Sequence, residues 1–352
     1  MILIIVIAFI SLIGLIILHE FGHFVLAKIL GVRVEEFGLG YPPRLFGKKF
    51  GETIYSLNIL PFGGFVKIYG QEEIISDPRS FSQKPFWKKA IIILGGVVSF
   101  WVISAILLSI VMIIGAPTIV EDDQNQGLIE PKIQIVSVLE GSPAWQAGLK
   151  VGDVIDGFNK VREVQEFTKN NAGKEISLTI QRGKEVFDVS LTLRVPGLDG
   201  EGPLGVGLAR TALKSHAWYK APFEGILATG NLTWIIIKSW VAVIISLFQG
   251  QGLPPGVEVG GPVKIFQLFT EIGSLGPSYF LQFIAIIAVH LALINILPIP
   301  ALDGGWLLFI VIGKLKGRPL DEKIVQKVSA VFFFLLIGLM IWITIKDIIS
   351  LF

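Results

Sequence analysis

Long apolar runs separated by polar segments dominate the hydrophobic pattern of the chain. The hydrocarbon core of a bilayer is about 30 Å thick, so a helix needs roughly 20 apolar residues to cross it. A run at 223–248 is long enough, but Glu224, Asn231 and Lys238 interrupt it. The pattern predicts a polytopic α-helical membrane protein. Hydropathy alone would make 223–248 a fifth span, but the topology set by the Lys- and Arg-rich loops predicts a helix at the outer surface or packed against the bundle. Four transmembrane helices are expected, at 2–30, 90–114, 279–297 and 325–352.

Residues 31–89 separate the first two spans and are rich in Gly and Lys. Within them, residues 53–69 alternate in polarity and carry β-branched and aromatic side chains around Pro61-Phe62-Gly63-Gly64. This pattern predicts a β-hairpin over 53–69. The stretch is apolar enough to enter a membrane, provided that protein or water satisfies its backbone polar groups.

Residues 116–215 have a different character, with short alternating strands at 133–138, 176–180 and 186–193. They predict an inserted α+β domain large enough to have its own core. The sequence GSPAWQAGLKVGDVIDGFN at 141–159 resembles the turn, short helix, turn and strand of a PDZ domain, of which one copy is present. A generic small β domain is the alternative. The expected organisation is a membrane core at 1–115, the PDZ domain at 116–215, an amphipathic surface region at 216–275 and a second membrane core at 276–352.

Composition narrows the class of protein. The chain of 352 residues is 52% hydrophobic, 16% charged, and has a mean hydropathy of +0.70. It contains no cysteine, which excludes disulfides, thiolate metal sites and cysteine nucleophiles. A net charge of +2 without basic repeats gives no indication of nucleic-acid binding. The first 18 residues lack a basic start and a small-residue cleavage site, so they are expected to stay as a transmembrane helix.

The first apolar run contains the sequence His19-Glu20-Phe21-Gly22-His23, which fits H-E-x-x-H. Residues at i and i+4 share one helix face, so both imidazoles can bind one Zn²⁺ while Glu20 acts as general base. Polar groups at this depth of an apolar helix are costly unless they have a function. The alternative is a pair of hydrogen-bonded histidines beside a solvated glutamate.

A catalytic zinc usually takes a third protein ligand and leaves one position open. The best candidate is Asp303, in the sequence NILPIPALDGG at 295–305. Pro298 and Pro300 are expected to break the helix, and the glycine pair at 304–305 allows the chain to turn closely around a site. The alternative is an aspartate that caps a helix at the membrane surface.

The two motifs together resemble the site-2 protease family of intramembrane zinc metalloproteases, over nearly the whole chain. The wider pattern resembles the bacterial regulator of sigma-E protease branch, here with a single PDZ domain. The resemblance implies His19, His23 and Asp303 as zinc ligands and Glu20 as base. It also implies that Asn295 and the hairpin, with Gly63 and Gly64, hold the substrate strand. Supporting stretches lie at 37–43, 60–67, 81–88, 260–264 and 317–320.

Two positions depart from the family pattern. The second span of relatives usually carries Gly-Pro-x-x-Asn, whereas this chain has Gly95-Gly96-Val97-Val98-Ser99. No polar role is therefore carried over to Ser99. His290 stands where relatives commonly have Asn, and we expect it to be a buried histidine bonded to a backbone carbonyl.

The expected activity is zinc-dependent endoproteolysis within the membrane. The substrates implied by the resemblance are single-span membrane proteins, such as anti-sigma factors or signal-peptide remnants, whose unwound segment pairs with the hairpin edge. Lys and Arg gather in 31–89 and 313–327, which places both on the cytoplasmic side of the inner membrane and the PDZ domain outside. The other partner is the lipid bilayer, and the oligomeric state stays open.

Two readings from other classes compete with a protease. A catalytically silent scaffold would bind partner tails through its PDZ domain, but such a protein would be free to lose Glu20. A zinc transporter would need ionisable groups along a path, whereas most of them here gather at one place. For the PDZ domain itself, a filter on substrate size is favoured over a docking site.

Overall fold

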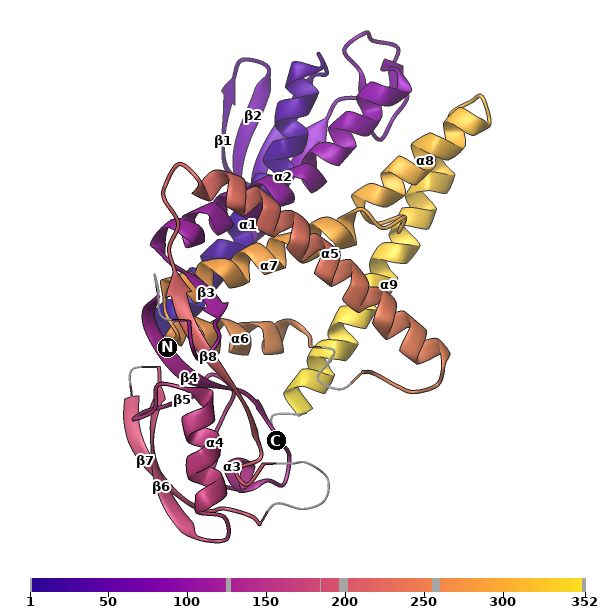
Figure 1. Cartoon of the computed structure of the whole chain (residues 1–352). Helices are drawn as coiled ribbons and strands as arrows, with labels where there is room; N and C mark the ends of the chain where they lie inside the picture. Colours follow the sequence, from indigo (N-terminus) through magenta and orange to yellow (C-terminus); the bar gives the residue numbers. More distant parts are fainter. Residues whose placement is uncertain (1, 125–127, 184, 196–201, 255–259, 350–352) are drawn as a thin grey trace. The chain divides into compact units, whose positions relative to one another are not determined.

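A computed structural model describes residues 2–124, 128–183, 185–195, 202–254 and 260–349. The chain divides into two compact units (Figure 1). The first comprises residues 1–108, 225–270 and 283–352, and the second comprises 109–224 with 271–282. Several long apolar helices and two β-sheets are present, as expected for a membrane protein with an inserted β domain.

Long helices make up most of the first unit. Five helices are long and apolar enough to cross a membrane, which is one more than the four predicted spans. The additional helix is α5, which continues unbroken over the interrupted run near 223–248. Length and composition alone therefore do not distinguish a surface helix from a span here. The helices are α1 (Ile2–Ile29), α2 (Phe86–Ile114), α5 (Ala221–Phe248), α6 (Pro262–Ser274), α7 (Pro277–Asn295), α8 (Asp303–Leu315) and α9 (Glu322–Ile349).

Helices α1 and α2 run antiparallel. The end of α1 packs against the start of α2, where Ala27, Ile92 and Ile93 share a buried cluster with Phe81 of the short 3-10 helix η1 (Phe81–Gln83). Gly22 and Gly95 meet further along the same pair of helices. Because glycine has no side chain, this contact lets the two backbones approach closely.

The segment between α1 and α2 forms a two-stranded antiparallel sheet of β1 (Val34–Phe50) and β2 (Thr53–Ile68). The predicted hairpin within 53–69 is wrong in its placement. The chain turns at Gly51, whose φ of +61° suits glycine, and residues 54–57 and 64–67 both pair with 36–39 of β1. A strand pairs on two sides at most, so residues 36–39 of β1 lie between the two halves of β2. The half around Gly64 is consequently an edge.

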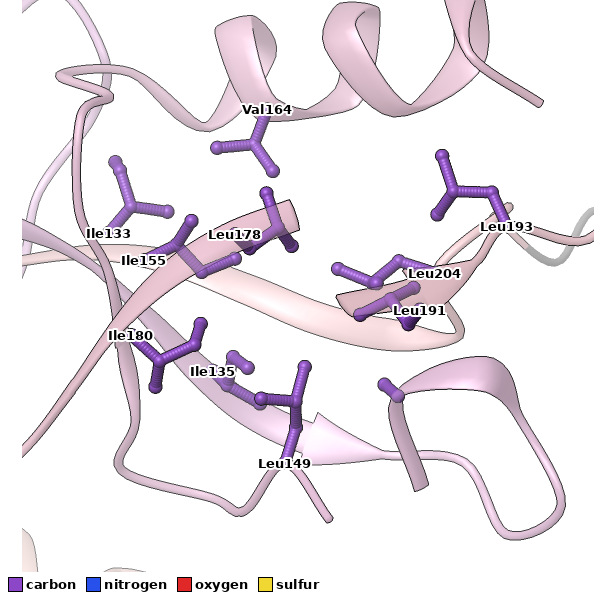
Figure 2. Close-up of a cluster of buried hydrophobic side chains, with 11 residues drawn as sticks. Ile133, Ile135, Leu149, Ile155, Val164, Leu178, Ile180, Leu191, Leu193 and Leu204 are labelled. Carbon is purple, nitrogen blue, oxygen red and sulfur yellow. The ribbon is translucent and has the colours of Figure 1, made fainter. Parts of the chain in front are cut away.

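The second unit contains a six-stranded sheet in the order β3-β8-β4-β5-β6-β7, with α3 and α4. The strands expected at 133–138 and 176–180 are confirmed within β4 and β6, and the one expected at 186–193 is confirmed as far as Thr192, where β7 ends. The turn, short helix, turn and strand of 141–159 are also present. In Figure 2, Val164 of α4 points toward the strands over Leu178. The elements are β3 (Ala116–Ile119), β4 (Ile129–Val138), α3 (Pro143–Gln146), β5 (Val154–Ile155), α4 (Val161–Asn170), β6 (Glu175–Arg182), β7 (Glu185–Thr192) and β8 (Val206–Lys214).

Candidate metal centre

His19 and His23 lie one turn apart on α1 and face the same direction. Their Nε2 atoms are 3.3 Å apart, and their rings meet edge-on at 4.8 Å between centroids. The residues are 8% and 7% exposed. As the i, i+4 spacing predicts, the two imidazole nitrogens face one point beside the apolar helix α1.

Asp303 approaches the same point from a broken helix. Helix α7 ends at Asn295, and α8 begins at Asp303, so the two prolines interrupt the helix as predicted. A Cβ on Gly304 would lie 2.2 Å from the carbonyl oxygen of Leu297. The turn consequently needs glycine, and it brings Asp303 Oδ2 to 3.3 Å from His19 Nε2 and 3.4 Å from His23 Nε2.

The three atoms fit a tetrahedral metal. Zinc bonds of about 2.0–2.2 Å in a tetrahedron place two ligand atoms roughly 3.3–3.6 Å apart. The observed separations of 3.3, 3.3 and 3.4 Å match this edge length. No donor among the described residues hydrogen-bonds to Asp303 Oδ2, although that atom is buried. These three residues could therefore hold a zinc ion and leave a fourth position open.

Helix α2 supports both imidazoles. His23 Nδ1 lies 2.9 Å from the carbonyl oxygen of Ile92, an acceptor that assigns the ring proton to Nδ1 and leaves Nε2 free to bind a metal. Phe100 stacks on His19 with centroids 4.7 Å apart. Sequence reasoning missed both contacts, because a backbone carbonyl and one phenylalanine among many apolar residues give no signal in the sequence.

Glu20 lies between the metal centre and the edge of the β1–β2 sheet. The backbone N–H of Val66 in β2 hydrogen-bonds to its carboxylate. A Cβ on Gly64 would lie 3.6 Å from Glu20 Cγ, at van der Waals contact, so this part of the edge strand passes directly beside Glu20 of α1. A carboxylate beside three metal-binding atoms has the position that a general base requires.

The remaining candidate residues have the following places. The Asn295 side-chain N–H donates to the Leu291 carbonyl oxygen of the same helix at 2.9 Å. The Asn295 amide oxygen takes no part in this hydrogen bond. His290 Nδ1 lies 3.0 Å from the Ile286 carbonyl oxygen, so the expected bond to a backbone carbonyl is confirmed, with the ring half-buried. Ser99 donates to the Gly95 carbonyl oxygen at 2.9 Å and not to the metal centre. Gly63 is buried, with a φ of +91°.

A cavity of about 520 Å³ lies elsewhere in the first unit. It is bordered by residues within 70–74 and 81–89, by α8 from Trp306 onward with the loop that follows, and by the start of α9. None of the residues of the candidate metal centre lines it. This cavity is therefore separate from the candidate metal centre.

A helix with H-E-x-x-H, completed by an aspartate from a broken apolar helix, defines a membrane zinc metalloprotease. Peptidase family M50 matches residues 7–339, and the chain belongs to this family, the site-2 proteases. A Clostridium perfringens protein named as a zinc metalloprotease is 34% identical over 98% of both chains. A similarly named protein of Clostridium acetobutylicum is 33% identical over 98% of this chain and 97% of its own. The Regulator of sigma-E protease RseP of Salmonella typhimurium is 27% identical, covering 94% of this chain and 96% of its own.

Proposed function

We propose that this zinc metalloprotease cleaves transmembrane segments within the bilayer, with His19, His23 and Asp303 as its metal ligands and Glu20 as general base. The observation that carries the proposal is the spacing of the three ligand atoms at the edge length of a zinc tetrahedron. His19 and His23 lie in α1, which is long and apolar enough to span a membrane, and Asp303 follows the break after α7, another such helix. Ionisable groups in such segments are retained for function.

Each protein group has a defined part in peptide hydrolysis. A bound zinc ion supplies Lewis-acid polarisation of the scissile carbonyl. Glu20 accepts a proton from the attacking water and delivers it to the leaving amine. The Val66 N–H keeps the Glu20 carboxylate directed toward the site. The Ile92 carbonyl keeps the Nε2 atom of His23 free for the metal.

The substrate is proposed to bind as an extended strand along the edge at Gly63 and Gly64. A transmembrane helix hides its carbonyls in its own hydrogen bonds, so a segment must unwind before cleavage. Segments with Gly, Asn or Pro unwind at lower cost. The edge half of β2 offers unpaired backbone groups for β-addition, and the Asn295 amide oxygen can accept from the same strand. Single-span membrane proteins, such as anti-sigma factors or signal-peptide remnants, are the substrate class that fits.

The proposed topology has four spans in the inner membrane, with the PDZ domain on the extracytoplasmic side. Within the second unit, the His216 N–H donates to the Met112 carbonyl at 2.7 Å, so the chain returns to the end of α2 before α5 begins. The Tyr279 side chain, at the start of α7, bonds to Thr211 of the same unit. The chain therefore leaves the second unit after His216 and returns to it at Tyr279. In the proposed topology, the segment between them begins and ends on the same side of the membrane. Helix α6, with 13 residues, is too short to cross, which supports α5 as a surface helix.

A Glu20→Gln variant tests the function. It should retain its zinc and lose at least ~10²-fold in cleavage rate, the usual scale of general acid–base catalysis. The measurement is cleavage of a model transmembrane substrate by the purified protein in detergent, with zinc content determined on the same samples. Equal cleavage by both forms would exclude Glu20 as the general base, and absence of cleavage by the zinc-loaded wild type would favour a silent scaffold.

A further inference from the structure

The contact between α1 and α2 is unusually close where the metal centre is built. A Cβ on Gly22 would lie 2.3 Å from the Gly95 carbonyl oxygen and 2.0 Å from Ser99 Oγ. In the reverse direction, a Cβ on Gly95 would lie 2.9 Å from the Gly22 carbonyl oxygen. A side chain at either glycine would therefore overlap atoms of the facing helix unless the helices separate.

This contact adjoins the bond that orients His23. Gly22 directly precedes His23, and Ile92, whose carbonyl accepts from His23 Nδ1 at 2.9 Å, lies one turn before Gly95 on α2. A hydrogen bond of this length tolerates little lengthening, since beyond about 3.5 Å it is lost. The separation of the two helices at Gly22 therefore decides whether the Ile92 carbonyl can hold the ring.

We propose that Gly22 is a positioning residue for the metal, because its missing side chain sets the helix separation at which Ile92 orients His23. The inference rests on the proposed ligand role of His23. A larger residue at position 22 should therefore weaken zinc binding even though the three proposed ligands and Glu20 are unchanged. Partners that orient a metal-binding histidine typically contribute 10–100-fold in metal affinity.

The test compares Gly22→Ala with Gly14→Ala in the full-length protein in detergent. Gly14 lies two turns earlier on α1, and a Cβ there would meet no atom of the described residues within 4 Å. We expect Gly22→Ala to bind zinc 10–100-fold more weakly in chelator competition, and its Co²⁺-loaded form to show an altered visible spectrum. Gly14→Ala should match the wild type in both measurements.

Gly95→Ala is the second variant. It places a methyl group in the same contact from the side of α2, where the overlap with neighbouring atoms is smaller than at Gly22. It should weaken zinc binding in the same direction, with an unfolding temperature nearer to that of the wild type. Wild-type zinc affinity in both Gly22→Ala and Gly95→Ala would overturn the inference, as would an equal loss in Gly14→Ala. A wild-type protein that binds no zinc through His23 would instead overturn the proposed function itself.

Discussion

At the scale of single residues, the contacts of the buried Oδ2 atom of Asp303 distinguish a metal ligand from a helix cap. Oδ2 lies 3.3 and 3.4 Å from two imidazole nitrogens, and no described donor hydrogen-bonds to it. A helix cap would instead accept from backbone N–H groups of its own first turn. The surroundings of Asp303 therefore favour the proposed ligand role over the capping alternative.

Replacing Asp303 by alanine should release the metal. The expected result is loss of zinc from the purified protein after dialysis against a mild chelator, because two imidazoles alone hold zinc weakly. Asp347→Asn is a matched control, since Asp347 is also buried and accepts from the backbone N–H groups of Gly261 and Lys264. That variant should lose stability but keep its zinc. Full zinc content in Asp303→Ala would assign Asp303 to the capping role.

At the scale of elements, the β1–β2 sheet is fixed to α1 through the turn at 51–52. Glu52 accepts from Lys28 Nζ of α1 at 2.7 Å and also from Arg79. The hydrogen bond from Lys28, followed by that from Arg79, lowers the pKa of Glu52 from 4.5 to about 2. The sheet that is proposed to present substrate is thus held by a charged contact at the end of α1.

The pH dependence of this contact follows from the lowered pKa. A carboxylate with a depressed pKa stabilises the fold above its ordinary pKa and loses that contribution as the pH falls through the folded value. The contribution of Glu52 should persist at pH 5–7 and disappear between about pH 4.5 and 2. Glu52→Gln mimics the protonated form at pH 7, so amide exchange in β1 and β2 should rise there relative to wild type. Glu73→Gln, on the exposed surface, should leave exchange unchanged; equal rates in all three proteins would exclude Glu52 as an anchor.

At the scale of the whole molecule, the direction of each helix constrains the number of crossings. Helices α1 and α2 are antiparallel, and the proposed topology has α7 parallel to α1, so that Asp303 reaches the depth of His19. This proposal requires an even number of crossings between α2 and α7. A single crossing by α5 would be incompatible with it.

Cysteine labelling measures the topology directly, because the native chain has no cysteine. Ser215→Cys and Gln251→Cys flank α5 at exposed positions. Both should react with an impermeant thiol reagent added from the extracytoplasmic side. Lys316→Cys, in the loop between α8 and α9, should react only after the membrane is permeabilised. Reaction of residues 215 and 251 from opposite sides would refute four spans.

Deletion of residues 116–215 distinguishes the two roles considered for this proposed PDZ domain. If the domain filters substrates by size, its removal should admit membrane proteins with bulky extracytoplasmic domains. Cleavage of substrates that already lack such domains should continue at a rate close to that of the intact enzyme. Loss of cleavage for every substrate, in a variant that retains its zinc, would identify a docking site instead.

The sequence alone determined the features that depend on local spacing. The i, i+4 relation of His19 and His23 needs only helical periodicity, and the break before Asp303 needs only the stereochemistry of proline. The strands of the second unit were likewise predictable, because alternation is a local signal. For the same reason, membership of the site-2 protease family could be inferred from short motifs.

The tertiary structure decided what depends on contacts between distant segments. The hairpin predicted within 53–69 is instead formed by β1 and β2, with its turn at Gly51. Alternation along a sequence predicts that a strand forms, but not which strand it pairs with. The meeting of Asp303 with His19, the bond from His23 to Ile92 and the contact of Gly22 with Gly95 join residues far apart in the chain. Each depends on how closely helices approach, and that distance is fixed by packing in three dimensions rather than by any pattern along the sequence.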